Sequence, residues 1–189
     1  MLLDDALVRR NFTLSGLDSI NYDGELSQVQ AIQNAASANV HGFEAGVEIR
    51  LPFGFGLQSR FNYQDGEEEL DDGSTAPLRH AAPWFGDTHL TCSRNRFKAD
   101  LYGIYNGEIS YEDLAPEERG KDYIYAIDAD GNPYSPAWYT LNLKATYFFT
   151  GSLKMSLGLE NLTDRRYRPY SSGISAPGRN FIVSLQAGF

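Results

Sequence analysis

The chain has 189 residues and a formal net charge of −9, an acidic balance that argues against a nucleic-acid partner because such partners need a basic face. Mean hydropathy is negative, and no stretch approaches the roughly 18 consecutive apolar residues that a membrane-spanning helix requires. A single cysteine, Cys92, excludes an intrachain disulfide.

The start of the chain carries only a weak pattern. Residues 3 to 10 alternate poorly between polar and apolar side chains, and we interpret them as the outer end of a strand whose beginning is missing. Residues 11 to 26 contain Asn21-Tyr22-Asp23-Gly24 and are predicted to form a loop. Met1-Leu2-Leu3 leads directly into two aspartates, without the basic start and apolar core of a signal peptide. This indicates either a protein that is not exported or a chain that belongs to a longer one.

The first clear strand ends an extended run that begins at Ser27. From Phe43 to Leu51 the odd positions are apolar and most even positions are charged. A period of two is typical of a β-strand with one apolar face. A short turn at Pro52-Phe53-Gly54 leads into a second alternating strand over residues 55 to 64. Charges at alternate positions would be costly inside a soluble core.

The middle of the chain repeats this arrangement. A long loop over residues 65 to 83, acidic at its start, leads to a more weakly alternating strand from Trp84 to Cys92. A short turn at Arg94-Asn95-Arg96 joins it to a strand from Phe97 to Tyr105. Residues 107 to 136 are predicted to form another long loop.

The C-terminal part shows the pattern most clearly. Apolar and polar residues alternate from Tyr139 to Phe149, from Leu153 to Glu160 and from Phe181 to Phe189. Only residues 150 and 151 separate the first two segments, which predicts a tight hairpin. The second and third segments are joined by a long polar loop, residues 161 to 179.

The alternating segments predict an all-β fold, an antiparallel meander of about eight strands. Long loops and short turns alternate between these strands. Strands of about ten residues with one apolar face suit a transmembrane β-barrel, because closure satisfies every backbone group and the apolar face meets lipid. The aromatic content of 13% suits the interfacial girdles of such a barrel, although a soluble β-sandwich core could use it too. Helices are nearly absent: Ala35 to Ala38 is the one Ala-rich patch, and residues 116 to 119 could form one helical turn.

A motif near the C-terminus is specific. Asn161-Leu162-Thr163-Asp164-Arg165-Arg166-Tyr167 is followed by Pro177-Gly178-Arg179 and by a last strand that ends in Phe189. This segment resembles the C-terminus of TonB-dependent outer-membrane receptors, in which Asn-Leu-(Thr/Phe)-Asp-x-x-Tyr closes a strand and Pro-Gly-Arg precedes the final one. Residues 39 to 48 also resemble the Gly-x-Glu strand of this family. The terminal phenylalanine resembles the signal that the barrel-insertion machinery reads.

The resemblance implies a transmembrane barrel of about 22 strands around an N-terminal plug, with short periplasmic turns and long extracellular loops. Residues 1–189 would be the C-terminal part of that barrel, without the plug, in the outer membrane of a Gram-negative bacterium. The implied function is TonB-dependent uptake of siderophore-iron, haem, vitamin B12 or a glycan, without enzymatic activity. The implied partners are outer-membrane lipid, lipopolysaccharide, the plug and the remaining barrel strands, with TonB reached only through the plug.

Two other interpretations stay open from the sequence. The chain could be a complete small outer-membrane barrel of about eight strands that acts as an adhesin or structural protein. It could also be a soluble lipocalin-like binding module, because a soluble barrel could direct the apolar residues of the same pattern inward and the polar residues outward. The asymmetry between loops and turns and the C-terminal motif favour the receptor.

Two acidic stretches suggest cation binding, and in each a structural interpretation is favoured. Asp128-x-Asp130-Gly131-Asn132 resembles the opening of a calcium loop, but Ala137-Trp138-Tyr139 supplies no carboxylate near its twelfth position. We therefore expect a glycine-containing turn in a solvated loop. A second acidic run could gather divalent ions that bridge lipopolysaccharide, although a solvated run of charges is favoured. That run consists of Asp65, Glu67, Glu68, Glu69, Asp71 and Asp72.

No constellation for catalysis is evident. His41, His80 and His89 fall on separate strands or loops without ligand spacing, although Asp87 is close to His89 in sequence. The sequence has no Gly-x-Ser-x-Gly elbow and no phosphate loop. We therefore expect no catalytic residue, no cofactor and no metal site, and the sequence assigns no ligand-binding residue.

Two further groups of side chains follow from the barrel interpretation. Charged residues at the polar positions of the strands are expected to form a mutually compensating lumen wall that touches the plug. They are Glu44, Glu48, Arg50, Arg60, Lys98, Asp100, Lys144, Lys154 and Glu160. Aromatic residues of the long loops could contact a substrate or pack a loop upon itself. They are Tyr111, Tyr123, Tyr125, Tyr134 and Tyr170.

Overall fold

The computed structural model describes residues 2–70 and 72–188, and the side chains of these except for residues 2–10 and 33–36. The predictions made for Asp71 and Phe189 therefore lie outside the described residues. The described chain is all-β apart from turns and the short 3₁₀ turn η1 (Pro52–Gly54). No helix within it is long and apolar enough to cross a membrane. The chain divides into two compact units, Met1–His41 with Asp65–Leu78 and Gly42–Gln64 with Arg79–Phe189.

The first unit contains paired strands where the sequence predicts mainly loops. Strand β1 (Leu2–Asn11) pairs antiparallel with the first part of β4 (Gln30–Arg50), so the weakly alternating start of the chain is a strand. Strands β2 (Ser19–Tyr22) and β3 (Glu25–Gln28) form a hairpin inside the predicted loop 11–26. The loop prediction is wrong there because Asp23 and Gly24 both have positive φ, as a tight two-residue hairpin turn requires.

The acidic loop after residue 64 also begins as a strand. Strand β5 (Phe55–Glu69) continues through Glu67, Glu68 and Glu69, which pair with β6 (Thr75–Pro77). The prediction of a loop from residue 65 placed the end of the strand too early. Backbone pairing does not require an apolar face, so charged side chains remain compatible with a strand wherever they reach solvent.

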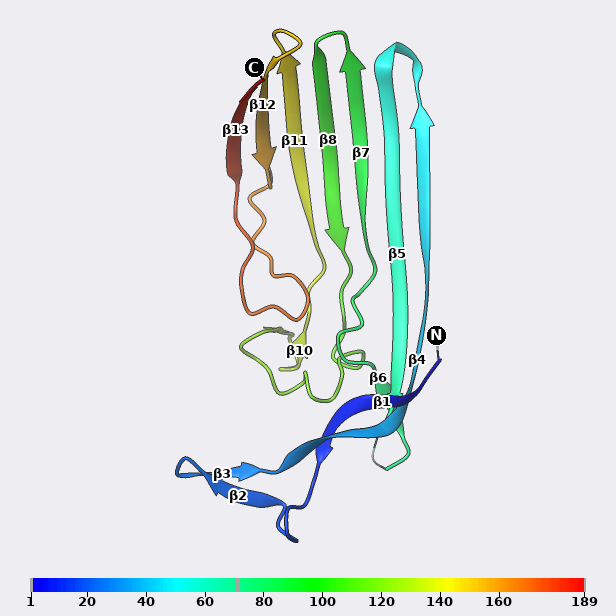
Figure 1. Ribbon diagram of the computed structural model, residues 1–189, viewed down its shortest axis with the longest axis vertical. Coiled ribbons are helices and arrows are strands. Elements are labelled where there is room, and N and C mark those ends of the chain that lie inside the picture. The colour runs from blue at the N-terminus through cyan, green and yellow to red at the C-terminus, as the bar shows by residue number, and fades with distance from the viewer. Residues whose placement is uncertain (1, 71, 189) are drawn as a thin grey trace. The chain divides into compact units, whose positions relative to one another are not determined.

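The second unit is one sheet of long strands in sequence order, β4-β5-β7-β8-β11-β12-β13. After β5 it contains the strands β7 (Phe85–Arg94), β8 (Phe97–Asn106), β11 (Trp138–Phe148), β12 (Leu153–Glu160) and β13 (Asn180–Ala187). Neighbouring strands from β5 onward pair antiparallel, and Figure 1 shows their short turns at one end and the long loops at the other. The antiparallel meander of about eight main strands is confirmed.

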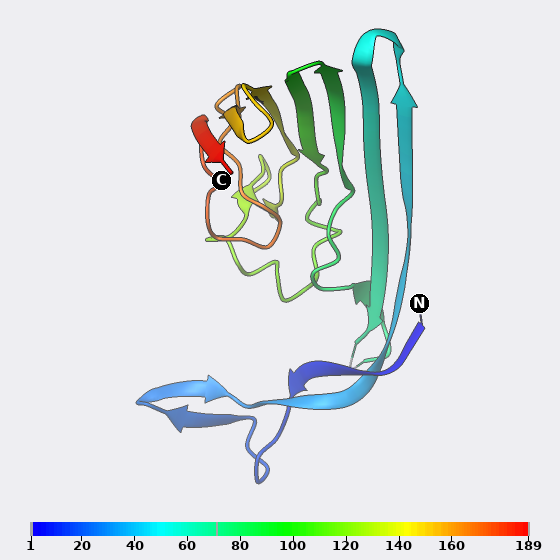
Figure 2. The same ribbon diagram turned by 45° about the horizontal axis from the view of Figure 1, so that its top comes forward.

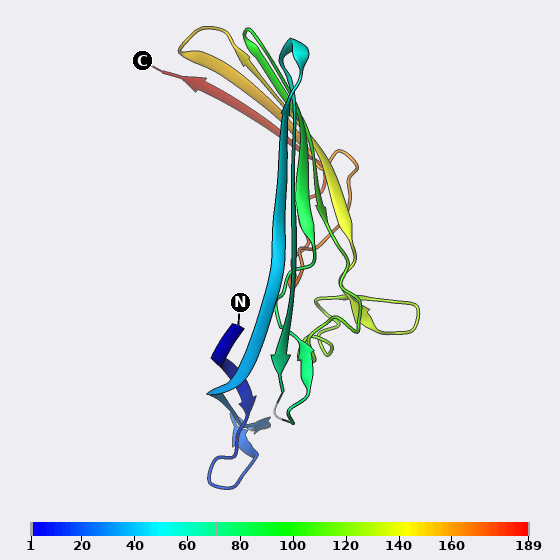
Figure 3. The same ribbon diagram turned by 90° about the vertical axis from the view of Figure 1, so that its right-hand side faces the viewer.

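Register places apolar residues on one face of this sheet. Leu57 pairs with Leu90, which pairs with Leu101, and Leu101 pairs with Leu143. Figure 3 shows the strands of this unit nearly edge-on as a single curved layer. The apolar face is consequently exposed: Val183 and Leu185 on β13 have exposed fractions of 57% and 68%. An exposed apolar surface of this extent requires lipid or another partner.

Aromatic side chains border the apolar face at both ends. Near the long loops, ring centroids lie 5.8 to 6.1 Å apart in a row that joins Tyr63, Phe43, Phe61, Trp84 and Tyr105. Near the turns, Phe97 pairs with Tyr147, whose ring meets Phe149 at 5.0 Å. Tyr139 pairs with Tyr105 in the first row, and Tyr147 lies eight residues further along β11, about 27 Å at the usual rise per residue. Two aromatic girdles about an apolar band of roughly 25 Å are typical of a membrane barrel.

Candidate functional site

The loops at one end of the second unit form an ordered cluster around a buried carboxylate. Glu118 has no exposed surface, and its carboxylate accepts hydrogen bonds from Arg79 Nε at 2.8 Å, Lys121 Nζ at 2.6 Å and the Tyr125 hydroxyl at 2.6 Å. Burial by itself raises the pKa of the Glu118 carboxyl. The three hydrogen bonds outweigh this effect and bring the pKa down to about 2. Because Arg79 precedes β7, the carboxylate ties two loops together.

A small apolar core supports this cluster. Ile109, Leu114 and Tyr125 are buried together, and Ile124 and Tyr170 pack against them. The rings of Tyr125 and Tyr170 lie 6.3 Å apart, which connects loop 107–136 to loop 161–179, and Figure 2 shows these two loops at the same end of the sheet. Of the loop aromatics that the sequence singled out, these two therefore pack between loops.

The other three loop aromatics are placed differently. Tyr111 lies beneath the guanidinium of Arg119, with 4.9 Å between its ring centroid and Cζ. Tyr134 belongs to the two-residue strand β10 (Pro133–Tyr134), which pairs with β9 (Ala126–Ile127). Tyr123 has an exposed fraction of 68%. Residues 116–119 form turns and not a helix. The Glu118 amide donates a hydrogen bond to the carbonyl of Ala115, three residues earlier.

The Asn-Leu-Thr-Asp motif forms a clamp at the end of β12. Asn161 is buried, and its backbone amide donates to the side-chain oxygen of Asn142 on β11 at 2.8 Å. The Asn161 side chain donates to the carbonyls of Arg165 at 2.8 Å and Pro177 at 3.2 Å, and accepts from the Arg165 amide. Asp164 accepts a hydrogen bond from the amide of Arg179 at 2.8 Å. The motif thus closes loop 161–179 upon itself.

Backbone geometry explains why asparagine and aspartate occupy this motif. Asn161 and Asp164 have φ values of 49° and 53°, in the left-handed region that these two residue types tolerate best among residues with side chains. The Tyr167 ring then stacks on Trp138 at 4.0 Å between centroids. Because Trp138 precedes Tyr139 of the apolar face, its side chain lies on the opposite, polar face of the sheet.

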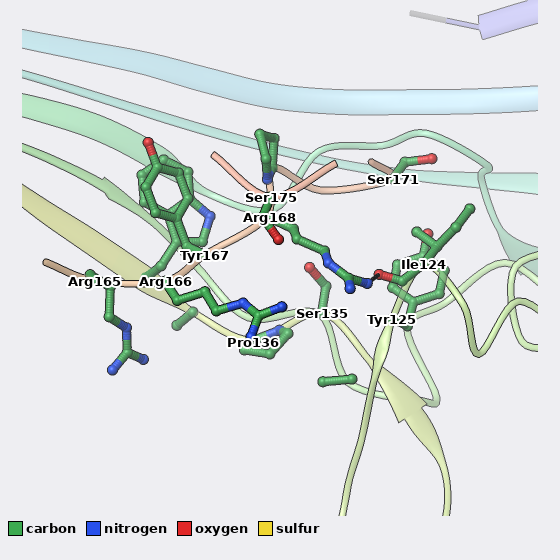
Figure 4. A pocket seen from close by; sticks show the side chains of 14 residues that line it. Ile124, Tyr125, Ser135, Pro136, Arg165, Arg166, Tyr167, Arg168, Ser171 and Ser175 are labelled. Carbon is green, nitrogen blue, oxygen red and sulfur yellow. Dashed lines mark hydrogen bonds between the residues drawn. The ribbon is translucent and has the colours of Figure 1, made fainter. Parts of the chain in front are cut away.

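A pocket of about 280 Å³ lies between the two loops and the start of β11, and Figure 4 shows it from close by. Its lining combines aromatic, basic and hydroxyl side chains. The lining residues are Ile124, Tyr125, Ala126, Ser135, Pro136, Ala137, Trp138, Arg165, Arg166, Tyr167, Arg168, Pro169, Ser171 and Ser175. No residue of this pocket is predicted from the sequence as ligand-binding, although the Arg-Arg-x-Arg run after Asp164 is a signal that could have indicated it.

The polar face of the sheet carries a network of charges. Asp87 lies 3.3 Å from Arg60 Nε and 3.2 Å from His89 Nε2, and the other ring nitrogen of His89 lies 2.9 Å from Asp100 Oδ2. The His89 ring also stacks on Tyr102 at 4.9 Å. Both ring nitrogens of His89 therefore lie beside carboxylates.

The other charges predicted for the lumen wall are also on this face or beside it. Lys98 and Lys154 lie over the ring of Phe148 at 5.6 and 5.9 Å. Lys144 pairs in register with Asp100 on β8 and with Gly158 on β12. On β4, the carboxylate of Glu48 lies 3.7 Å from Arg50 Nε. Glu44 alternates with the outward Phe43, and Glu160 ends β12 in register with Asn180.

In the two candidate cation stretches Asp128 and Asp72 form turns, whereas Glu67 to Glu69 belong to strand β5. Asp128 Oδ1 accepts hydrogen bonds from the amides of Asp130 and Asn132 at 2.9 and 2.8 Å, at the tip of the β9–β10 hairpin. Asp72 accepts from Ser74, which lowers the pKa of the Asp72 carboxyl. Among the described residues, no group of three or more His, Cys, Asp or Glu is arranged to hold a metal ion.

The other two histidines each have a partner within their own unit. His41 lies 3.7 Å from Asp65 in the first unit. His80 shares a hydrogen bond of 3.2 Å with the hydroxyl of Ser171, which connects the chain before β7 to loop 161–179.

Comparison with known proteins identifies the family. The model for the TonB dependent receptor-like beta-barrel matches residues 7–162. The chain belongs to this family. Family membership confirms the resemblance seen at the C-terminus and overturns the soluble lipocalin-like interpretation. No curated protein sequence matches the chain.

Solved structures of TonB-dependent receptors and transporters share its fold. The copper transporter OprC is 17% identical with a TM-score of 0.72, and the match covers 100% of this chain and 26% of OprC. The FrpB iron transporter from Neisseria meningitidis is 16% identical with a TM-score of 0.66, covering 98% of this chain and 26% of FrpB. A mutant of the ferric enterobactin receptor PfeA from Pseudomonas aeruginosa is 16% identical with a TM-score of 0.61, and the match covers 91% of this chain and 26% of PfeA. The chain thus spans about a quarter of these proteins.

Proposed function

We propose that residues 1–189 form the C-terminal part of the barrel wall of an outer-membrane receptor that imports a scarce nutrient with energy supplied through TonB. The location is the outer membrane of a Gram-negative bacterium. The apolar face contacts lipid and lipopolysaccharide, and the polar face contacts an N-terminal plug inside the lumen. TonB acts through that plug, and the chain has no catalytic role.

The observation that carries this proposal is the apolar band between two aromatic girdles. The rows around Trp84 and Tyr147 are separated by about the thickness of a bilayer core. Aromatic rings favour the membrane–water interface, and the leucines between the rows favour hydrocarbon. A sheet exposing this face to water would be costly, so lipid is the surrounding that this face fits.

The two faces and the two ends support separate roles. The polar face carries the Arg60–Asp87–His89–Asp100 network, whose charges are expensive in lipid but suit a lumen filled by water and a plug. The loop end carries an ordered cluster with a pocket, which suits capture of a ligand outside the cell. The similar structures include a copper transporter, an iron transporter and a ferric enterobactin receptor, which supports an iron- or copper-containing nutrient such as siderophore-iron or haem over vitamin B12 or a glycan.

Gene disruption tests this function. Cells of the source bacterium that lack the coding region are grown under iron limitation and under copper limitation, and accumulation of each radiolabelled metal is compared with a complemented strain and with a strain without TonB. We expect reduced accumulation of one metal in both mutants and recovery of the protein in the outer-membrane fraction. Outer-membrane location with unchanged uptake would favour the alternative of a structural or adhesive barrel, and absence from that fraction would overturn the proposal.

A further inference from the structure

The pocket at the loop end has a charge opposite to that of the chain. The sequence contains 25 acidic and 16 basic residues, yet the pocket is lined by Arg165, Arg166 and Arg168 and by no aspartate or glutamate. Such a concentration of guanidinium groups in an acidic protein favours an anionic ligand and disfavours a cationic one.

The arginines differ in how available they are. Arg168 Nη1 already donates to the carbonyls of Tyr123 and Ile124, at 3.1 and 3.0 Å. In the described part of the chain, neither Arg165 nor Arg166 makes a side-chain hydrogen bond or an ion pair. Figure 4 shows Arg166 extending beneath Arg168 toward Pro136, while Arg165 projects away from the other labelled side chains. Arg166 is therefore the guanidinium with free donors at the pocket.

The remaining lining is suited to a flat ring. Trp138 stacks on Tyr167, and Ile124, Tyr125 and Pro136 add apolar surface. The volume of about 280 Å³ is at the lower end of the range for ligand pockets. The pocket is therefore large enough for one small ring with a charged group and too small for an entire siderophore.

Resting on the proposed uptake function, we propose that this pocket is a subsite for a planar aromatic acid, either free or as one arm of the imported ligand. The ring packs against the aromatic and apolar lining. The carboxylate or an equivalent acidic oxygen accepts hydrogen bonds from the guanidinium of Arg166. Bidentate pairing makes arginine well suited to a planar carboxylate.

The test uses a matched pair of probes on the full chain in detergent micelles. Benzoate and benzamide have the same shape, but only benzoate is charged. A Trp84→Phe variant leaves Trp138 as the one tryptophan, so that its fluorescence reports the pocket directly. We expect saturable quenching by benzoate with an affinity about tenfold or more above that for benzamide, since a charged hydrogen bond is lost with the amide.

Arginine variants locate the site in the same Trp84→Phe background. Arg166→Glu should weaken benzoate binding about tenfold or more, and Arg166→Lys should recover part of it because the charge is kept without the fork geometry. Arg94→Glu, at the opposite end of the sheet, is the control for net charge and should leave binding unchanged. The same titration of the native chain, followed by the NMR line widths of benzoate, removes the dependence on the fluorescence variant.

The outcomes are distinct. Equal binding of benzoate and benzamide, or equal losses in Arg166→Glu and Arg94→Glu, would overturn the subsite. So would the absence of saturable benzoate binding to the native chain. None of these results bears on metal uptake by cells, so the subsite can fail while the proposed function stands, and the reverse is also possible.

Discussion

The side-chain amide of Asn161 donates to the carbonyl of Pro177, sixteen positions further along the chain, at 3.2 Å. This bond joins the end of β12 to the segment that precedes β13. One buried asparagine therefore fixes where β13 begins beside β12. The residue type is required twice, once for its hydrogen bonds and once for its positive φ.

Replacing Asn161 should therefore be strongly destabilising. Asn161→Ala removes several buried hydrogen bonds and leaves alanine in the left-handed region, an expected loss of about 2–4 kcal/mol of unfolding free energy. Thr163→Ala is the control, because Thr163 is exposed and its hydroxyl lies 3.5 Å from Asn161 Oδ1. Urea titration in micelles measures both variants, and equal stability of the two would contradict the role of the clamp.

The loop cluster should open at low pH. The pKa of Glu118 is lowered from 4.5 to about 2, so its ionisation contributes stability that is fully present above the unfolded pKa and is lost as pH falls from about 4.5 through about 2. The contribution is about 3 kcal/mol at neutral pH. Hydrogen exchange of residues 107–136 across this range measures the opening.

A variant separates Glu118 from the general effect of acid. Glu118→Gln should show rapid exchange already at pH 7, because Arg79 and Lys121 lose a buried anion. Glu117→Gln changes the same charge at an exposed neighbouring position and should behave as the native chain does. Unaltered protection in Glu118→Gln would show that the carboxylate does not hold the loops.

The two faces of β5 should respond in opposite ways to a new charge. Leu57 belongs to the apolar face, whereas its neighbour Gln58 pairs with His89 on the polar face. Leu57→Arg should destabilise the membrane-inserted state by about 2–4 kcal/mol, as expected for arginine facing the bilayer midplane. Gln58→Arg should cost much less. Urea titration from phospholipid vesicles provides the comparison, and equal costs would contradict the assignment of the faces.

Packing of Tyr105 over Gly86 predicts a site where no side chain is tolerated. A Cβ at Gly86 would collide with the carbonyl oxygen of Arg60 and approach the Tyr105 ring, whereas a Cβ at Gly103 has its nearest neighbour at 3.7 Å. Gly86→Ala should lower the unfolding free energy by about 1–3 kcal/mol from overpacking. Gly103→Ala should be close to neutral. Thermal unfolding followed by circular dichroism distinguishes them.

The chain studied alone should depend on detergent. Strand β13 is an edge of the sheet as described, and the apolar face lies open to water. Unpaired edges and large apolar patches promote association, so we expect aggregation, domain swapping or micelle binding. Light scattering that finds a monodisperse monomer without detergent would contradict this expectation.

The sequence by itself determined the long strands from Phe43 onward, the side of each that is apolar, and the resemblance to the family. Alternation between Tyr139 and Phe149 is a local property with a period of two, so it survives without knowledge of any partner strand. The end of a strand is less certain from sequence, as Glu67 to Glu69 show, because backbone pairing continues where the side-chain pattern stops.

Only the tertiary structure decided what the loops do. Arg79 and Glu118 are 39 residues apart, and Tyr125 and Tyr170 are joined across two separate loops, so no local pattern announces either contact. The motif from Asn161 to Tyr167 was evident as a resemblance, but its residues acquire roles only when Trp138 and Pro177 are brought beside them. Loop sequences have no regular period, and long-range packing determines which residues a loop contacts. The pocket beside Arg166 could therefore not be predicted from the sequence, because its lining comes from two loops and the start of β11.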